Sequence, residues 1–381
     1  MKPSSVNRLC WCIVSAFPLC GCVGLVLHAA RHMHKSSPAK TVAATPERSL
    51  PPAPVRTELE AVVARGAPGV TAIVMRRGDL VFRLDVGPID HDAQLPVASA
   101  SKWMTAALVM TVVDEGKLSL DAPISRYLPE FRGLAGTTTL RELLAQTSGE
   151  GSLRDGIDIR QDARITLGES AADVARRALA NPPGVVFKYG GPGFQVAGAA
   201  VEAVTGKRWA QLFDERIAGP LGMSHTYWTH LPARGATPAQ TLNPLLQGGV
   251  VTTAIDYMRF LTMLAQDGRA GGRRILSAQA VDAMETVQTL GKSMAYVPRG
   301  AKGGMRSRNV QYALGNWCET WDAAHRCMLV SSPGAFGTFP WIDRRSGLYG
   351  IFFTRDLLPA IVDNFTRARQ AIIATYALQR H

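Results

Sequence analysis

The chain has 381 residues, of which 46% are hydrophobic and 19% are charged, and its formal net charge is +12. This length and apolar content can bury a large core, which excludes a disordered chain, and the absence of an internal repeat excludes a repeat protein. The positive charge alone would suggest a nucleic-acid partner, but the basic residues are spread along the chain without a recognition motif, so we expect no nucleic acid.

Residues 1–30 have the pattern of a signal peptide or membrane anchor. Basic residues precede an apolar stretch, Leu9–Ala30, as is typical of export signals. Leu19-Cys20-Gly21-Cys22 is similar to a lipobox, which makes Cys22 a lipidation candidate, but the apolar residues that continue past Cys22 favour an uncut anchor of roughly 20 residues. Residues 31–55 would be a flexible tether. We therefore expect an exported protein, in the periplasm or envelope, held at the inner membrane by this segment or by a lipid.

The first part of the globular region, 56–381, is predicted to contain a short helix, a β-hairpin and a buried helix. The hairpin turn is Arg77-Gly78-Asp79. The buried helix is an apolar run that ends before Gly116, a residue type that commonly terminates helices. The predicted ranges are 56–66 for the first helix, Val70–Met75 and Leu80–Val86 for the strands, and 103–113 for the apolar run.

Ser99-Ala100-Ser101-Lys102 stands at the start of that apolar run. Residues three apart share one face of a helix, so the Ser99 hydroxyl can meet the Lys102 amine, whereas Ser101 points elsewhere. Burial and the positive end of the helix dipole both disfavour the ammonium form of Lys102. A neutral amine beside a hydroxyl is an activated nucleophile suited to acyl transfer. The same pattern at Ser37–Lys40 lies in a Pro- and Ser-rich tail and opens no helix.

The chain then reads as helices from about 100 to 290, followed by strands and a final helix. This order predicts an α+β fold, in which an antiparallel β-sheet built from both chain ends is flanked by helices and carries a mostly helical inserted subdomain. The α/β part would be 56–98 and 305–381, the helical part 99–304, with an active site between them. The predicted helices are Leu140–Gln146, Ala171–Leu179, Phe194–Val204, Arg208–Ile217, Ala254–Gln266 and 357–378; the predicted strands are Gln311–Glu319, Arg326–Ser331, Gly337–Ile342 and Leu348–Thr354.

Cys318 and Cys327 flank a stretch that looks like the turn of a β-hairpin. Opposed strand cysteines at that separation can form a disulfide in an oxidising compartment, and two buried free thiols are the alternative. No pair of histidines has a metal-ligand spacing, and no Gly-rich phosphate loop follows a strand. We expect neither a metal nor another cofactor.

Further segments follow Val97–Lys102 in the order and spacing of one enzyme superfamily. Tyr189-Gly190-Gly191 stands where that superfamily has Tyr-x-Asn, and Ser332-Pro333-Gly334-Ala335 where it has Lys-Thr-Gly or His-x-Gly. Over residues 55–380 the chain resembles the serine β-lactamase and penicillin-binding-protein superfamily, and within it the class C-like branch of β-lactamase-related serine hydrolases, family VIII esterases and D-aminopeptidases. Three more segments carry this resemblance: Leu143–Gly149, Pro220–Met223 and Gly248–Thr253.

The resemblance implies a β-lactamase/transpeptidase-like fold and a role for each motif residue. Ser99 would attack a carbonyl to form an acyl-enzyme, while Lys102 and Tyr189 share the proton transfers; a Tyr189 that only caps a Gly-rich turn is the alternative. The N–H groups of Ser99 and Ala335 would hold the oxyanion. Gly334 would let the backbone approach the substrate closely.

Two positions depart from the superfamily pattern. Gly191 replaces an Asn that holds the amide of the substrate, and Ser332 replaces a Lys or His that helps to bind a substrate carboxylate. Sites without hydrogen-bonding groups discriminate poorly between analogues. We therefore expect an exported serine hydrolase for small-molecule esters, amides or D-amino-acid peptides, peptidoglycan fragments included, with weak action on β-lactams. The alternative is a non-catalytic envelope protein that keeps the fold to bind a cell-wall fragment or a partner.

Overall fold

The computed structural model of the chain describes residues 50–89, 91–150, 162–230, 241–297 and 310–377, all within one compact unit, Thr45–His381. The predicted export segment, with Cys22, and nearly all of the tether lie outside these ranges. Within them, no helix combines the length and apolarity needed to cross a membrane.

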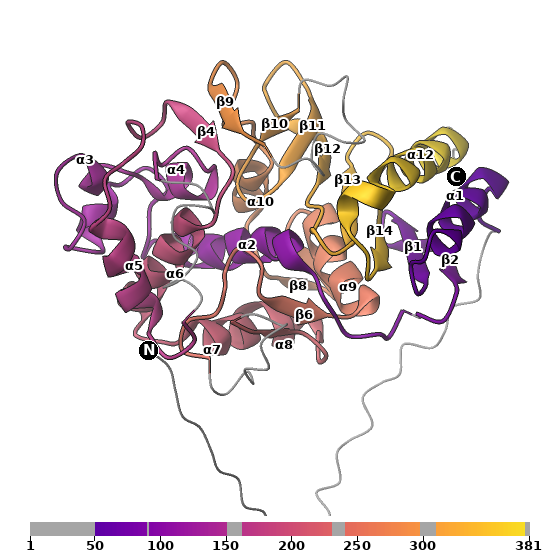
Figure 1. The fold of residues 1–381 in the computed structure, drawn as a ribbon, viewed down its shortest axis with the longest axis horizontal. Coiled ribbons are helices and arrows are strands. Elements are labelled where there is room, and N and C mark those ends of the chain that lie inside the picture. Colours follow the sequence, from indigo (N-terminus) through magenta and orange to yellow (C-terminus); the bar gives the residue numbers. More distant parts are fainter. Residues whose placement is uncertain (1–49, 90, 151–161, 231–240, 298–309, 378–381) are drawn as a thin grey trace, which may run out of the picture. The chain divides into compact units, whose positions relative to one another are not determined.

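A seven-stranded antiparallel sheet joins the two ends of the globular chain (Figure 1). Strand β1 near the start pairs with β14 near the end, from Val70 opposite Thr354 to Arg76 opposite Leu348. Because β14 is buried along its whole length, its apolar residues can pack on both faces of the sheet. The prediction of an α+β fold with a sheet made from both chain ends is confirmed. In spatial order the strands are β10 (Gln311–Tyr312), β11 (Trp317–Trp321), β12 (Cys327–Ser331), β13 (Phe339–Asp343), β14 (Leu348–Thr354), β1 (Val70–Arg76) and β2 (Asp79–Val86).

Two predicted strands differ from the observed ones at their turns. The β1–β2 turn consists of Arg77 and Gly78 alone, both with positive φ, as a two-residue hairpin turn requires; Asp79 already belongs to β2. The single strand predicted over Gln311–Glu319 is wrong. A turn centred on Gly315, with a φ of 80°, splits it into β10 and β11, which pair with each other.

Successive side chains of a strand point to opposite faces of the sheet, so the strands contribute to two separate hydrophobic cores. On one face, helices α1 (Ala53–Ala64) and α12 (Leu358–Tyr376) pack on each other and on the sheet (Figure 1). On the other face, Ile73 of β1 and Ile351 of β14 join the core of the helical part, which includes helix α9 (Ala254–Ala265). The sheet therefore separates a helical pair from the helical part that carries Ser99.

Helix α2 (Ser101–Asp114) runs through the helical part and is buried over nearly all of its length, as a helix that is apolar on every side must be. It begins two residues before the predicted apolar run. Helix α10 (Ala278–Met284) and the short helices and strands near it were not predicted, because their apolar runs are too short to show a helical or strand period. The other helices are α3 (Gly133–Gly136), α4 (Leu140–Leu144), α5 (Leu167–Ala175), α6 (Pro192–Thr205), α7 (Trp209–Phe213), α8 (Gly219–Leu221) and α10 (Ala278–Met284), with a π-helical turn over Asp214–Ala218. The short strands are β3 (Leu95–Pro96), β4 (Val186–Lys188), β5 (Tyr227–Trp228), β6 (Val250–Thr252), β7 (Arg269–Ala270), β8 (Arg273–Arg274) and β9 (Ser293–Tyr296).

Candidate active site

Ser99 lies in a 3₁₀ turn, Ala98–Ala100, that leads directly into helix α2. Ala98, immediately before it, has a φ of 45°, a conformation that costs a residue with a Cβ of the order of 1–3 kcal/mol. Such strain persists only where the surrounding structure holds it. Gly334 is part of that structure, because its backbone lies directly against the turn. A Cβ at this position would lie only 2.0 Å from the Val97 carbonyl oxygen. Gly334 therefore approaches the strained turn closely, while its approach to a substrate stays a prediction.

Two further side chains fasten this turn. The Ser101 hydroxyl donates to the Ala98 carbonyl oxygen at 2.7 Å and accepts from the Val250 N–H at 3.0 Å. The Tyr257 hydroxyl donates to the Ala100 carbonyl oxygen at 2.8 Å. Ser101 thus has a structural partner on each side, while Ser99 keeps a partly exposed side chain.

Lys102 is 1% exposed and lies against the Ser99 hydroxyl. Its Nζ is 3.2 Å from Ser99 Oγ and donates 2.9 Å to the backbone carbonyl oxygen of Gln247. No carboxylate pairs with Lys102 within the described ranges; the rings of Tyr189 and Phe194 cover it instead, with centroids 4.7 and 5.5 Å from Nζ. Burial without a countercharge lowers the pKa of Lys102 from 10.5 to about 7.

Tyr189 follows strand β4 and is held in a cluster of aromatic rings. It stacks on Trp317 of β11 with 5.4 Å between ring centroids, and Tyr312 meets it edge-on at 6.0 Å. Phe187 completes the cluster. Since three neighbouring rings fix its position, the Tyr189 ring is presented to Lys102 in a single orientation.

The segment after Tyr189 contacts two glutamines that the sequence analysis did not select. The Gly190 N–H donates to Gln146 Oε1 at 2.6 Å. At Gly191, a Cβ would lie 1.9 Å from Oε1 of Gln247. The Gln247 amide thus occupies the space that a side chain at position 191 would take. No motif in the sequence pairs Gly191 with Gln247. The lack of a side chain at Gly191 was the one signal that another group could lie there.

The segment Ser332–Ala335 follows β12 and runs beside the nucleophile turn. The Ser332 hydroxyl is buried and donates to the Gly315 carbonyl oxygen at 3.3 Å, so it faces the protein interior. Ala335 is exposed, and its carbonyl oxygen accepts from the Leu358 N–H. Among the described residues, neither the Ala335 N–H nor the Ser99 N–H donates to another protein group. Both are therefore available to a ligand atom.

Cys318 of β11 and Cys327 of β12 form a disulfide, with 5.4 Å between their Cα atoms. Beside it, Arg369 of α12 forms a bidentate ion pair with Glu319, at 2.6 and 2.5 Å, and both side chains are at most 1% exposed. Ser331 also donates to Glu319 at 2.6 Å. These contacts fix the strands that lead to Ser332 and fasten α12 to β11.

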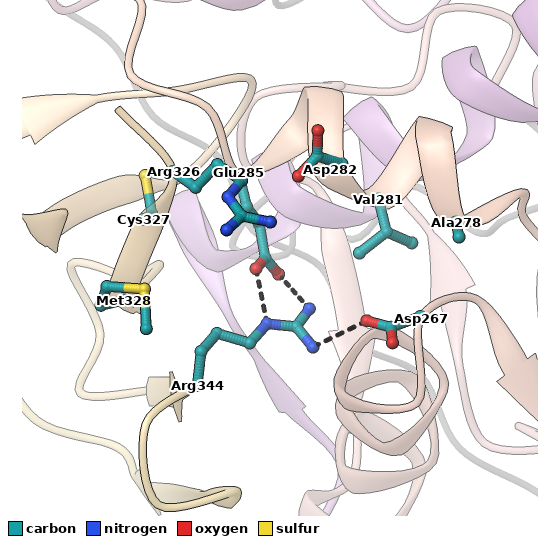
Figure 2. A pocket seen from close by; sticks show the side chains of 9 residues that line it. All are labelled: Asp267, Ala278, Val281, Asp282, Glu285, Arg326, Cys327, Met328 and Arg344. Carbon is teal, nitrogen blue, oxygen red and sulfur yellow. Dashed lines mark hydrogen bonds and ion pairs between the residues drawn. The ribbon is translucent and has the colours of Figure 1, made fainter. Parts of the chain in front are cut away.

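A pocket of 340 Å³ lies elsewhere, between α10, β12 and the β13–β14 turn (Figure 2). Figure 2 shows Arg344 in its centre, bonded to Glu285 through two nitrogens and to Asp267. None of the residues that line it is Ser99, Lys102 or Tyr189. The described part of the chain holds no group of His, Cys, Asp and Glu side chains arranged to bind a metal ion.

The beta-lactamase family model matches residues 55–374 of the chain. A solved structure of a proposed beta-lactamase from Bacteroides dorei DSM 17855 is 31% identical and has a TM-score of 0.74, covering 86% of this chain and 99% of that one. Esterase EstB from Burkholderia gladioli is 34% identical over 43% of this chain and 48% of its own length. The D-alanyl-D-alanine-carboxypeptidase/endopeptidase AmpH from Escherichia coli (strain K12) is 29% identical over 51% of this chain and 57% of its own. The alignments thus span about half the length of these two relatives.

Proposed function

This chain belongs to the beta-lactamase family, and from that premise we propose that it is a serine hydrolase that forms an acyl-enzyme on Ser99. The observation that carries the proposal is the contact of 3.2 Å between Lys102 Nζ and Ser99 Oγ, made by an amine whose pKa is about 7. A general base works best when its pKa lies near the working pH. With Lys102 neutral, the Ser99 hydroxyl donates along the same contact.

In the first step, Ser99 Oγ attacks the carbonyl carbon of the substrate and its proton passes to Lys102 Nζ. The carbonyl electron pair moves onto the oxygen, which accepts hydrogen bonds from the Ser99 and Ala335 N–H groups. The hydrogen bond from Nζ to the Gln247 carbonyl oxygen keeps the amine aimed at Ser99. The strained turn holds the Ser99 N–H, and the segment that carries the Ala335 N–H packs against this turn through Gly334.

In the second step, the tetrahedral adduct collapses and its bond to the leaving group breaks. The leaving group takes the proton from Lys102, directly or through the hydroxyl of Tyr189, whose ring covers Nζ at 4.7 Å. Water then attacks the acyl carbon and loses a proton to this pair. The bond between the acyl carbon and Ser99 Oγ breaks, and Oγ takes that proton back as the acid product leaves. Lys102 is thus the base in one direction and the acid in the other.

We propose esters, amides and D-amino-acid peptides as the substrate class, with β-lactams turned over weakly. An esterase and a D-alanyl-D-alanine carboxypeptidase among the similar proteins support this range. The interior orientation of Ser332 supports the weak action on β-lactams, because its hydroxyl is not offered to a substrate carboxylate.

The proposed place of work is outside the cytoplasm. Residues 1–30 have the composition of an export segment, and the disulfide between Cys318 and Cys327 is the kind of bond that persists in oxidising compartments. Cell fractionation and mass spectrometry of the mature N-terminus would distinguish an uncut anchor, a lipidated Cys22 and a cleaved signal.

A fluorophosphonate probe tests the proposed nucleophile. It should label Ser99, as located by peptide mapping, and Ser99→Ala should abolish the labelling. Ser101→Ala is the matched control: it removes a neighbouring hydroxyl that only fastens the turn, so labelling at Ser99 should persist at a lower rate. Labelling of another residue in Ser99→Ala, or none in the unaltered protein, would contradict the proposal.

A further inference from the structure

Gln247 lies between the Tyr189 segment and the catalytic pair. Its backbone carbonyl oxygen accepts from Lys102 Nζ at 2.9 Å, and Nζ in turn is 3.2 Å from Ser99 Oγ. Its side-chain amide extends over Gly191, where all three amide atoms would lie within 2.2 Å of an added Cβ. One residue therefore contacts both the proton-transfer amine and the site of the missing side chain.

The Gln247 side chain has hydrogen-bonding capacity that the described residues leave unused. Gln247 is 7% exposed, and its Oε1 is buried without a hydrogen-bond partner among them. A buried carbonyl oxygen without a donor is unfavourable, and such atoms are rare in folded proteins. An oxygen in this state, on a residue whose backbone carbonyl contacts the Lys102 amine and whose amide lies over Gly191, is suited to accept an N–H from a bound molecule.

We propose that Gln247 is the specificity-determining residue of this site, and that its amide accepts the N–H of a substrate whose acyl group carries an amide next to the reacting carbonyl. This inference rests on the proposed function. The amide supplies from another part of the chain the polar contact that Gly191 cannot supply. The substrate class narrows accordingly from esters and amides in general to N-acylamino esters and peptides.

A matched pair of esters isolates the proposed hydrogen bond. The p-nitrophenyl esters of N-acetylglycine and of 4-oxopentanoic acid differ only in an N–H replaced by CH₂. The quantity measured is the ratio of kcat/KM for the first ester to kcat/KM for the second. Gln247→Ala and Gln247→Leu should each lower this ratio about tenfold or more. Gln211→Ala, at an exposed position on α7, is the control and should leave the ratio unchanged.

A second variant tests the same contact without altering Gln247. The backbone at Gly191 has a φ of −133°, which any residue adopts, so Gly191→Ala should fold. Its methyl group must displace the Gln247 amide, which is the far end of a flexible side chain. The ratio should therefore fall as it does in Gln247→Ala, and Gly191→Ala should cause no further fall when Gln247 is already Ala.

An unchanged ratio in Gln247→Ala and Gly191→Ala would overturn the assignment of Gln247 while leaving the serine hydrolase in place, provided that Ser99 is still acylated. Equal and additive effects of the two substitutions would also overturn it, because they would show that the residues act separately. If the unaltered protein releases p-nitrophenol from neither ester and no adduct forms on Ser99, the proposed function fails and this inference fails with it.

Discussion

Two buried basic side chains, Arg369 beside β11 and Lys102 at the active site, differ in whether a carboxylate neutralises them. Both side chains are 1% exposed. Arg369 is neutralised by a bidentate contact with Glu319, whereas no carboxylate in the described chain pairs with Lys102, and its pKa falls to about 7. A buried charge must be paired or must lose its proton. The first solution ties α12 to the sheet, and the second produces a base.

The choice of residue type matches each solution. Arginine keeps its proton at any ordinary pH and offers a planar fork that fits a carboxylate, so it suits a permanent structural pair. Lysine can release its proton when it is desolvated, so it suits a site where a proton must move. Substitutions that exchange these properties therefore test the difference between the two sites.

Lys102→Arg should have the largest effect. It places a permanent charge beside Ser99, so the rate of fluorophosphonate labelling should fall by about 10³-fold or more, nearly as far as in Lys102→Ala. Lys117→Arg, at an exposed position after α2, is the control and should label normally. A labelling rate in Lys102→Arg close to that of the unaltered protein would show that Lys102 is not the base.

Glu319→Gln should leave Arg369 charged and without a countercharge in the interior. Breaking a buried pair in this way should lower the free energy of unfolding by about 3–5 kcal/mol, as measured by urea denaturation. Glu60→Gln, in an exposed pair with Arg56, should change it by less than about 0.5 kcal/mol.

The double variant Glu319→Leu with Arg369→Met should be more stable than Glu319→Gln alone, because it leaves no charge buried. If the double variant proves less stable than Glu319→Gln, Glu319 does more than neutralise the charge of Arg369. The contrast drawn between Arg369 and Lys102 would then be wrong.

Removing the disulfide should have a smaller effect. Cys318 and Cys327 are separated by 9 positions, and replacing both with Ser should lower the free energy of unfolding by about 2–3 kcal/mol, as expected for a short loop. Labelling of Ser99 should survive, since the catalytic pair lies on another element. A loss of labelling in a folded variant would show that the disulfide between β11 and β12 also holds the catalytic residues in position.

The pH dependence of stability gives the smallest effect per pH unit, and it distinguishes Lys102 from the permanently charged Arg369. The pKa of Lys102 is about 7 in the folded protein, whereas the ordinary value of 10.5 applies to the unfolded chain. Between these values the unfolded chain binds more protons, so stability relative to Lys102→Met should rise with pH by about 1.4 kcal/mol per unit, and should level off below about pH 7. Urea unfolding of both proteins at several pH values measures this difference; a difference that does not vary with pH would place the pKa outside the window.

The features that could be predicted from the sequence are local or periodic. The contact between Ser99 and Lys102 follows from helical spacing, and the pairing of the chain's two ends follows from the order of strands and helices. The disulfide between Cys318 and Cys327 needed only a hairpin between them. The division of Gln311–Glu319 into two strands depends on the positive φ of Gly315, which lets β10 and β11 pair, and the apolar pattern alone does not show it.

Gln247 could not be predicted because its contacts cross the fold. It is 145 positions from Lys102, and its amide is placed by the packing of two loops rather than by a motif. The direction of the Ser332 side chain likewise depends on where the Gly315 carbonyl lies. Contacts of this kind become visible only once the chain is folded.

The rate at which a fluorophosphonate labels Ser99, followed from about pH 5 to pH 9, tests the assignment of Lys102 as the base. If an uncharged Lys102 activates the hydroxyl, the rate should rise through a pKa of about 7 and then level off, and this rise should vanish in Lys102→Arg. A rate that is the same across this range, or a rise that survives in Lys102→Arg, would contradict it.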